Sequence, residues 1–290
     1  MVTVIYDALA SWERDYILCD LLGTIENKIV KILSDAEITN EQFYQTEIVN
    51  RNIFVFSSNE KNFSEIKKIV DLIKPLVIIH LSDEWGQHPE YLSLSDQVKL
   101  YLRQHNCIQY KPGNEVIQIP LGYMTNMLQQ KSCLNTTIIP IKERSYTWSF
   151  IGALKQDREQ MISTFSQKLP NGYVNNQITP QDMYHIYSKS IFVLNGRGNV
   201  SLDCFRIYEA IIAGAIPVIV GDPDEINHVF SYNGQPPPFL SATTWDEAVI
   251  KCQELLKDEE TLFKVLEANR DWFKNKITEI QEKIGNAVCL

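Results

Sequence analysis

The chain has 290 residues, a formal net charge of −9 and 44% hydrophobic residues, a composition that excludes a disordered or fibrous protein. This length is typical of one large domain or two smaller ones. The acidic balance argues against nucleic acid as the main partner, and no segment has the roughly 20 apolar residues of a membrane span.

The N-terminal segment and the cysteines indicate where the protein works. The first 22 residues include Asp7, Glu13 and Asp20, so they do not resemble a signal peptide. The six cysteines are scattered and form no C-x-x-C pair, which argues against a zinc or thioredoxin-like site. We therefore expect a cytoplasmic, soluble protein without a cysteine-based zinc site.

In the first half of the chain, short β-rich runs alternate with stretches of helical spacing. Such alternation predicts a Rossmann-like α/β domain, which we place at residues 1–135. The expected strands cover 2–6, 52–56, 76–80, 107–110 and 116–119, and the expected helices cover 15–33, 63–73 and 92–104.

The second half repeats this pattern after an irregular linker at residues 136–146. The domain at 147–262 is expected to contain strands at 147–152, 191–194 and 216–220, and helices at 157–168, 180–188 and 245–256. A further helix is predicted between Ser201, a good N-cap residue, and Gly214, which suits a helix end. The last expected helix covers 260–284, and we expect the C-terminal segment 263–290 to pack back on the first domain.

The loop after the strand at 191–194 has the features of a phosphate-binding loop. Its glycines, Gly196 and Gly198, let a ligand approach the backbone, and a helix N-terminus follows. Ligands of open α/β sheets bind at this edge of the sheet. The alternative is a plain turn that needs glycine for its conformation. A dinucleotide fingerprint would require a third glycine at Ser201.

Two charged residues on the following helix, Arg206 and Glu209, share one face because they are three positions apart. As a surface ion pair they would contribute well under ~1 kcal/mol. In the functional interpretation, Arg206 faces a diphosphate and Glu209 accepts hydrogen bonds from ribose hydroxyls. Few other charges lie on this helix, which favours the functional interpretation.

Residues 190–220 resemble the donor-site core of exostosin-like glycosyltransferases. The resemblance lies in an apolar strand, the Gly/Arg loop, Phe205-Arg206, an acidic residue and the run Ala213-Gly214-Ala215-Ile216-Pro217-Val218. Phe150-Ile151-Gly152 with Arg158 is similar to the family's phosphate-contacting region. His80-Leu81-Ser82-Asp83-Glu84 is similar to a motif of some exostosin-like xylosyltransferases. The short chain also resembles glycosyltransferases of large algal DNA viruses.

The resemblance implies a GT-B architecture, with two Rossmann-like domains facing a cleft. It implies an inverting transfer from a nucleotide-diphosphate sugar, with UDP favoured and xylose as the first choice of sugar. It implies no metal, and the sequence has no clean Asp-x-Asp motif. The residues it assigns to donor binding are Gly152, Arg158, Tyr173, Asn195, Gly196, Arg197, Gly198, Ser201, Arg206 and Glu209.

An inverting reaction needs a base that takes the proton of the acceptor hydroxyl. Asp83 and Glu84 follow a buried strand and are the first candidates, although Ser82-Asp83-Glu84 also suits an ordinary helix N-cap. The weaker candidates are His80, Asp7 and Glu13. Aromatic faces pack well on sugar rings, so the expected acceptor site, for a glycan, contains Trp85, His88 and Tyr123.

Two other functions stay open at this point. A non-catalytic nucleotide-sugar-binding or carbohydrate-binding protein would have the same donor loop without a base in the first domain. An NAD-dependent oxidoreductase would need the complete glycine fingerprint that the sequence lacks. A monomer is expected because no heptad pattern marks a coiled coil.

Overall fold

The computed structural model describes residues 1–38, 40, 52–58, 62–105, 116–230 and 236–289. The chain divides into two compact units. Unit 1 contains Met1–Pro120 and Thr278–Leu290, and unit 2 contains Leu121–Ile277. Residues 121–146, which the sequence analysis gave to the first domain and the linker, therefore group with unit 2.

Unit 1 is built on a parallel sheet. In the described residues the strand order is β2-β1-β3-β4-β5-β6, and every pair is parallel. The four inner strands, β1, β3, β4 and β5, are buried along their whole length, as expected for a sheet covered on both faces. The strands are β1 (Val2–Asp7), β2 (Lys28–Leu33), β3 (Asn52–Ser57), β4 (Val77–Leu81), β5 (Leu100–Arg103) and β6 (Val116–Gln118).

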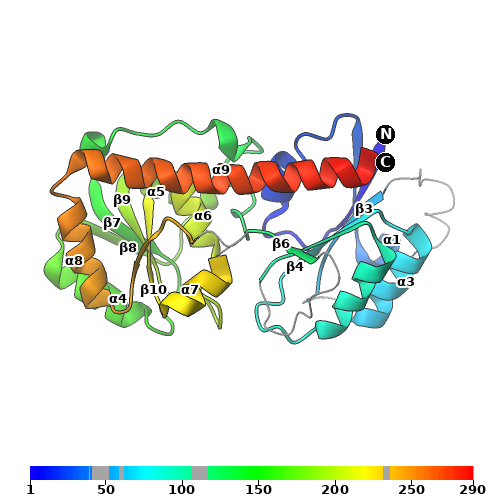
Figure 1. The fold of residues 1–290 in the computed structure, drawn as a ribbon, viewed down its shortest axis with the longest axis horizontal. Coiled ribbons are helices and arrows are strands. Elements are labelled where there is room, and N and C mark those ends of the chain that lie inside the picture. The colour runs from blue at the N-terminus through cyan, green and yellow to red at the C-terminus, as the bar shows by residue number, and fades with distance from the viewer. Residues whose placement is uncertain (39, 41–51, 59–61, 106–115, 231–235, 290) are drawn as a thin grey trace. The chain divides into compact units, whose positions relative to one another are not determined.

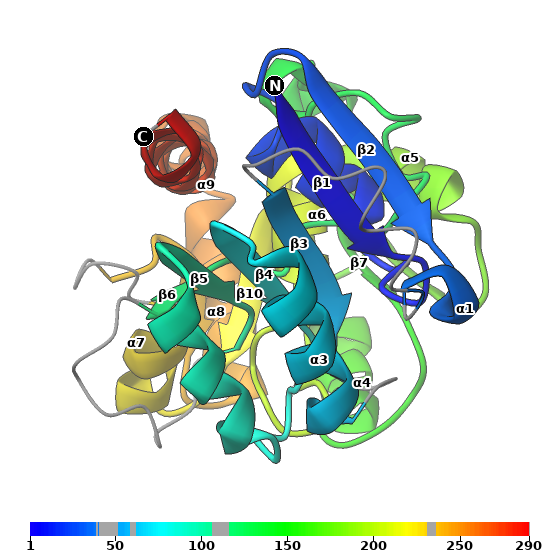
Figure 2. The ribbon, with the colours of Figure 1, turned by 90° about the vertical axis from the view of Figure 1, so that its right-hand side faces the viewer.

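Helix α3 (Phe63–Ile73) illustrates how the local sequence sets an element of unit 1. The Asn62 side chain accepts from the Glu65 N–H, and the Glu65 side chain accepts from the Asn62 N–H, which forms a capping box. Its apolar face, including Ile66 and Val70, packs on the sheet beside β3, as Figure 2 shows. The other helical segments are η1 (Tyr16–Leu21), α1 (Asp35–Ile38) and η2 (Pro89–Gln97).

The helix predicted over 15–33 is wrong beyond its first turns. A π-helical segment ends at Leu21, and β2 begins at Lys28. Gly23 follows this segment at a position that only glycine fits, because a Cβ there would lie 2.2 Å from the carbonyl oxygen of Cys19. The β-branched Ile29, Val30 and Ile32 then favour a strand.

The helix predicted over 92–104 is also wrong. Residues up to Gln97 form a 3₁₀-helix, and Leu100–Arg103 form β5, which pairs with β4 and β6. Tertiary pairing between two strands decides this segment, because its apolar residues fit either period. The strand predicted at 107–110 lies outside the described residues.

Unit 2 contains a second parallel sheet, with strand order β11-β10-β9-β7-β8 in the described residues. Its core includes Trp148, Phe150, Phe165 and Trp245, and α4 and α8 lie side by side against the sheet (Figure 1). The strands are β7 (Tyr146–Ile151), β8 (Gly172–Asn175), β9 (Ser190–Asn195), β10 (Ile216–Val220) and β11 (Leu240–Ala242).

The helices of unit 2 match most of the predicted ones. They are α4 (Arg158–Lys168), α5 (Pro180–Ser188), α6 (Phe205–Ile212), α7 (Pro223–Phe230), α8 (Trp245–Leu255) and α9 (Glu259–Cys289), whose last residues belong to unit 1, with short 3₁₀ turns η3 (Cys133–Asn135) and η4 (Ile141–Glu143). Helix α7 and the short strands β8 and β11 were not predicted from the sequence.

The start of α6 differs from the prediction. The helix begins at Phe205 after Cys204, not at Ser201, whose hydroxyl accepts from the Asp203 N–H at 3.0 Å. Gly214 ends it as expected, with a φ of 78°. The predicted α/β class, with two Rossmann-like parallel-sheet domains, is confirmed. No described helix combines the length and the apolar character that a membrane crossing requires.

Candidate functional site

At the carboxyl edge of the unit 2 sheet, two arginines that were predicted to bind the donor diphosphate lie close to the same glycine. Gly152 follows β7 with a φ of +149°. A Cβ at this position would lie 2.8 Å from Nη2 of Arg206 and 3.8 Å from Nη1 of Arg158. Both guanidinium groups also lie over the ring of Phe150, at 4.7 Å for Arg206 and 5.7 Å for Arg158. Glycine is therefore needed here for the close approach of the side chains.

Arg206 is held in place by the ends of two strands. Its Nε donates to the carbonyl oxygen of Ile151 at 3.0 Å, and its Nη1 donates to Oδ1 of Asn195 at 3.2 Å. The Nδ2 of Asn195 in turn donates to the carbonyl oxygen of Leu202 at 3.1 Å. Asn195, which was predicted to contact the donor, is fully buried and orients Arg206.

Arg158, at the start of α4, is held by backbone carbonyl groups. Its Nε and Nη2 donate to the carbonyl oxygen of Arg197 at 3.1 and 2.7 Å, and its Nη1 donates to that of Ala153 at 2.8 Å. Burial and the neighbouring charge of Arg206 lower the pKa of Arg158. The two cations thus repel each other in a partly dry environment.

Neither of these arginines has an acidic partner within ion-pair distance in the described part of the chain. Arg158 is 4% exposed and Arg206 is 8% exposed. Buried charges in proteins are normally paired, because an unpaired charge loses its hydration. Two such cations at the carboxyl edge of a parallel sheet form a site that suits a ligand with several negative charges, such as a diphosphate.

Glu209 lies one turn further along α6 and is 2% exposed. Its Oε1 accepts from the Met124 N–H at 3.3 Å. Burial raises the pKa of Glu209 to about 7, against the opposing effects of Arg206 and of this hydrogen bond. A carboxyl group with this pKa accepts hydrogen bonds when ionised and donates when protonated, which suits a hydroxyl-bearing ligand.

The raised pKa of Glu209 predicts a pH-dependent gain in stability for Glu209→Gln. The folded-state pKa of about 7 exceeds the ordinary value of 4.5, so the contribution of the carboxyl group is fully present below pH 4.5 and is lost as the pH rises to about 7. Glutamine keeps the acceptor for Met124 and never ionises. We expect the variant to be more stable than the parent at pH 8, by up to about 3 kcal/mol, and nearly equal near pH 4.5.

Urea unfolding of the parent and of Glu209→Gln at pH 4.5 and pH 8 measures this difference. Glu225→Gln is a control, because Glu225 is also on a unit 2 helix but is half-exposed. A stability difference for Glu209→Gln that is the same at both pH values would contradict the buried, proton-retaining carboxyl group.

The loop after β9 packs against the side chain of Arg158. A Cβ on Gly196 would lie 2.6 Å from Cγ of Arg158, so the glycine admits that side chain. The Gly198 N–H donates to the carbonyl oxygen of Ser201 at 2.9 Å, which closes the loop. Arg197 turns toward α7, where Nη1 and Nη2 lie 2.5 and 2.8 Å from the two oxygens of Glu225. Its charge is therefore neutralised within the protein.

Tyr173 lies on β8, the edge strand that the sequence analysis missed. Its hydroxyl accepts from Nδ2 of Asn175 at 3.1 Å, and its ring centroid is 5.1 Å from that of Tyr146. The side chain is half-buried, so part of the ring is open to a ligand.

In unit 1, the first two candidates for the base have different environments. Asp83 forms an ion pair with Arg103, both side chains being 1% exposed, and its Oδ1 accepts from the Gln87 N–H at 2.9 Å. Ser82 and Asp83 have φ values of 70° and 63°, so they do not form the helix N-cap that was the alternative interpretation. Glu84 is half-buried.

His80 has the structural environment expected of a histidine at a buried strand end. Its Nδ1 lies 2.8 Å from the Tyr101 hydroxyl, and its ring stacks on Phe56 at 4.8 Å. Burial and the charge of Arg103 hold the pKa of His80 well below its usual range. The neutral imidazole therefore belongs to the core of unit 1.

Glu13, a weaker candidate in the sequence, has the environment of a general base. Its carboxyl group is 4% exposed and hydrogen-bonded to the side chain of Gln104, and burial raises its pKa to about 7. Oε1 of Gln104 also accepts from the Ser82 N–H at 2.8 Å, so Gln104 links Glu13 to the end of β4. Asp7 is buried beside the end of β1, and its Oδ1 accepts from the Leu9 N–H at 3.1 Å.

The residues expected at the acceptor site are distributed over both units. In unit 1, the Trp85 side chain is 60% exposed, and Nδ1 of His88 lies 3.5 Å from Oε1 of Glu90. In unit 2, Tyr123 is fully buried and its hydroxyl donates to the carbonyl oxygen of Lys131 at 3.3 Å. Across the described residues, no three His, Cys, Asp or Glu side chains are grouped to hold a metal ion.

Comparison with known proteins identifies the fold. Neither a protein-family model nor a curated protein matches the chain, whereas solved structures match nearly all of it. An alpha-glucosyltransferase in complex with UDP and a 13-mer DNA has a TM-score of 0.62 at 10% identity, covering 98% of each chain. The T4 phage enzyme BGT in complex with UDP-glucose has a TM-score of 0.55 at 14% identity, covering 100% of each chain.

A third match is a putative UDP-N-acetylglucosamine 2-epimerase from Listeria monocytogenes, with a TM-score of 0.56 at 10% identity, covering 98% of this chain and 95% of the other. These matches confirm the GT-B fold predicted from the sequence. At such low identity the likeness is one of fold, and the exostosin-like resemblance stays a prediction.

The comparisons correct one expectation. From the net charge of −9 we argued against nucleic acid and expected no nucleic-acid partner, yet the alpha-glucosyltransferase that shares the fold is bound to DNA. The net charge of the whole chain was the wrong quantity on which to base this expectation. Binding to a phosphate backbone depends on the local arrangement of positive groups, and an acidic total does not prevent a locally positive surface.

Proposed function

We propose that this protein is a glycosyltransferase that uses a UDP-sugar as its donor. The observation that carries the proposal is the pair of buried arginines, Arg158 and Arg206, which meet at Gly152 without an acidic partner among the described residues. A sugar-linked diphosphate supplies the missing negative charge. The proteins of similar fold that were solved with UDP or UDP-glucose support this assignment.

In this proposal, each part of the unit 2 edge has one task. Arg158 and Arg206 bind the diphosphate, and Asn195 orients Arg206. Glu209 accepts hydrogen bonds from the ribose. Because two cations already offset the charge of the leaving diphosphate, the reaction proceeds without a metal. The sugar is xylose and its transfer inverts the anomeric centre, as the exostosin-like motif implies.

For the inverting step we place the base at Glu13 in unit 1. Its pKa of about 7 lets the carboxylate take a proton near neutral pH. The acceptor hydroxyl loses its proton to Glu13, its oxygen bonds to the anomeric carbon, and the bond from that carbon to the diphosphate breaks. UDP leaves with its charge offset by the arginines. Asp83 is unsuited because Arg103 holds it as an ion pair.

Ligand-induced thermal stabilisation tests the donor assignment. We expect UDP and one UDP-sugar, with UDP-xylose first, to raise the melting temperature equally in EDTA and in Mn²⁺, because binding to the folded state stabilises it. GDP and NAD are the controls for base and cofactor class. Stabilisation by NAD alone, or by no nucleotide, would refute the proposal.

A transfer assay then separates an enzyme from a binding protein. With the donor identified, release of UDP is measured with glycan acceptors, which we propose as the substrate class, and with hydroxymethylated DNA. DNA is included because structures of similar fold contain it. Donor binding without UDP release for any acceptor would favour the non-catalytic alternative.

A further inference from the structure

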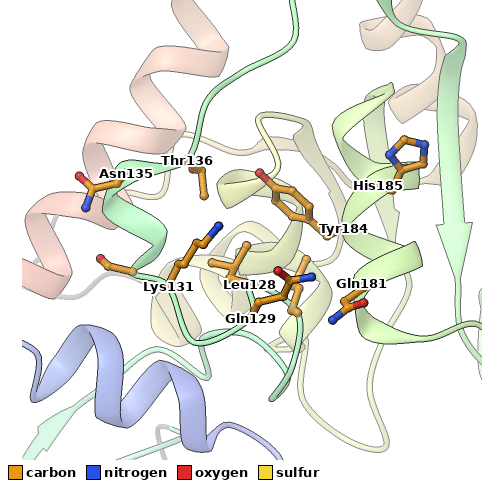
Figure 3. Close-up of a pocket in the computed structure, with 10 residues that line it drawn as sticks. Leu128, Gln129, Lys131, Asn135, Thr136, Gln181, Tyr184 and His185 are labelled. Carbon is orange, nitrogen blue, oxygen red and sulfur yellow. The ribbon is translucent and has the colours of Figure 1, made fainter.

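Unit 2 contains a pocket of about 660 Å³ that lies apart from the arginine pair. The segment from Met127 to Thr136 forms one wall, and α5 forms the other with Gln181, Tyr184 and His185. Figure 3 shows the pocket with these side chains. No residue that we assign to donor binding lines it, so it is a separate site. Its volume is in the range of pockets that bind small ligands.

Five of the polar side chains that line this pocket point to a ligand, whereas Ser132 and Thr136 are already hydrogen-bonded to backbone groups. Within the described chain, the side chains of Gln129, Lys131, Asn135, Gln181 and Tyr184 make no hydrogen bond or ion pair. Figure 3 shows the Lys131 ammonium, the Gln129 amide and the Tyr184 ring around one space. Amide and phenol groups both donate and accept hydrogen bonds, as sugar hydroxyls do. The pocket therefore matches the hydrogen bonding of a saccharide.

The apolar parts of the pocket complement the other surface of a sugar. Met127 and Leu128 are buried beneath it, and Tyr184 is half-buried with its ring at the wall. Burial raises the pKa of Tyr184, which keeps the hydroxyl neutral at physiological pH. An aromatic face packs against the C–H groups of a sugar ring while its polar tip reaches a hydroxyl.

The charge of the lining separates a saccharide from other ligand classes. Among the described residues that line the pocket there is no Asp or Glu, although the chain has a net charge of −9, so a metal ion or a cationic peptide is not favoured. Lys131 is a single cation. The carboxyl edge of the unit 2 sheet has two buried arginines, whereas this pocket has only the one lysine charge. The pocket is therefore not a second diphosphate site.

We propose that this pocket is a carbohydrate-binding subsite that holds one or two sugar units of a glycan through Tyr184, Lys131 and the surrounding amides. The proposal does not depend on transferase activity. Because the pocket is separate from the donor site, binding of a glycan to it can be measured in the absence of a UDP-sugar.

Saturation-transfer difference NMR tests the subsite with xylobiose, cellobiose and maltose at millimolar concentration. We expect one of them to receive saturation from the 290-residue chain, and Tyr184→Ala to weaken its binding at least about tenfold through loss of the aromatic face. Lys131→Ala, at an exposed position, should also weaken binding. Xylose and glucose, measured in parallel, distinguish a site for a free sugar from a site for a glycan.

The controls separate this site from the donor site and from a folding defect. Gln167→Ala changes an exposed glutamine on α4 that is bonded to Ser163, and should leave binding unchanged, while Gln181→Ala should weaken it. UDP-induced stabilisation should be the same in all these variants. The proposal fails if none of the sugars receives saturation, or if Tyr184→Ala and Lys131→Ala both bind the sugar as the parent does.

Discussion

The variant Glu13→Gln, which removes the proposed catalytic base, is expected to lower kcat by about 10²–10⁴-fold. Its affinity for the UDP-sugar should stay unchanged. Glutamine keeps the size of Glu13 and an acceptor for Gln104, so the fold around it is preserved. What it loses is the ability to take a proton from the acceptor hydroxyl. The loss should therefore fall on turnover and not on donor binding.

The pH profile of the parent gives a second readout of the same role. Because burial raises the pKa of Glu13 to about 7, the carboxylate form that acts as a base is lost as the pH falls through 7. We expect kcat/KM to decrease below that pH and to reach a plateau above it. In Glu13→Gln the inflection should disappear from kcat measured at saturating UDP-sugar, where an effect of Glu209 on donor binding, whose pKa is also about 7, does not contribute.

Two further variants make this prediction specific. Glu26→Gln changes an exposed glutamate before β2 and should leave kcat unchanged. Glu84→Gln tests the other acidic candidate, which is half-buried after β4. A large loss of kcat in Glu84→Gln together with a normal Glu13→Gln would transfer the role of base to Glu84.

Removal of one buried cation, in Arg206→Met, is expected to weaken UDP binding by about 100-fold. A hydrogen bond to a charged group contributes roughly 1.5–3 kcal/mol, and each 1.4 kcal/mol corresponds to a factor of ten in affinity. Methionine fills a similar volume over the Phe150 ring but has neither charge nor donors. Isothermal titration with UDP, in EDTA, measures the change.

The conservative and control variants distinguish diphosphate binding from support of the fold. Arg206→Lys keeps the charge but loses the planar donor arrangement that reaches Ile151 and Asn195, so it should recover only part of the affinity. Arg270→Met changes an arginine of α9 that donates to Thr136, away from the donor edge, and should bind UDP normally. Parent-like affinity in a folded Arg206→Met would remove Arg206 from the donor site.

Several features of the unit 2 sheet and its carboxyl edge were predictable from local sequence. The apolar runs of β4, β9 and β10 are continuous because buried parallel strands face other layers on both sides. At Gly196 we expected a ligand to approach the backbone, but an arginine side chain lies there, and an arginine side chain also lies against Gly152, which the family resemblance had singled out. The spacing of Arg206 and Glu209 placed both on one helix, and the structure buries both.

The sequence also misled us where two elements compete for the same apolar residues. Residues 28–33 and 100–103 fit helical spacing, yet they form β2 and β5 because pairing with a neighbouring strand satisfies their backbone groups. Ser201 has the side chain of an N-cap but lies four residues before α6, since the loop that closes around Gly198 delays the helix.

Local patterns of side chains were enough to predict the α/β class and the two parallel-sheet domains, because strand and helix periods are read from neighbouring residues. Only the tertiary structure decided which charges are partnered. Asp83 meets Arg103 from the next strand, Arg197 meets Glu225 from α7, and Glu13 meets Gln104, each over at least twenty residues of chain. Burial and pairing set the charge and the pKa of a side chain, and both follow from contacts that no local pattern records.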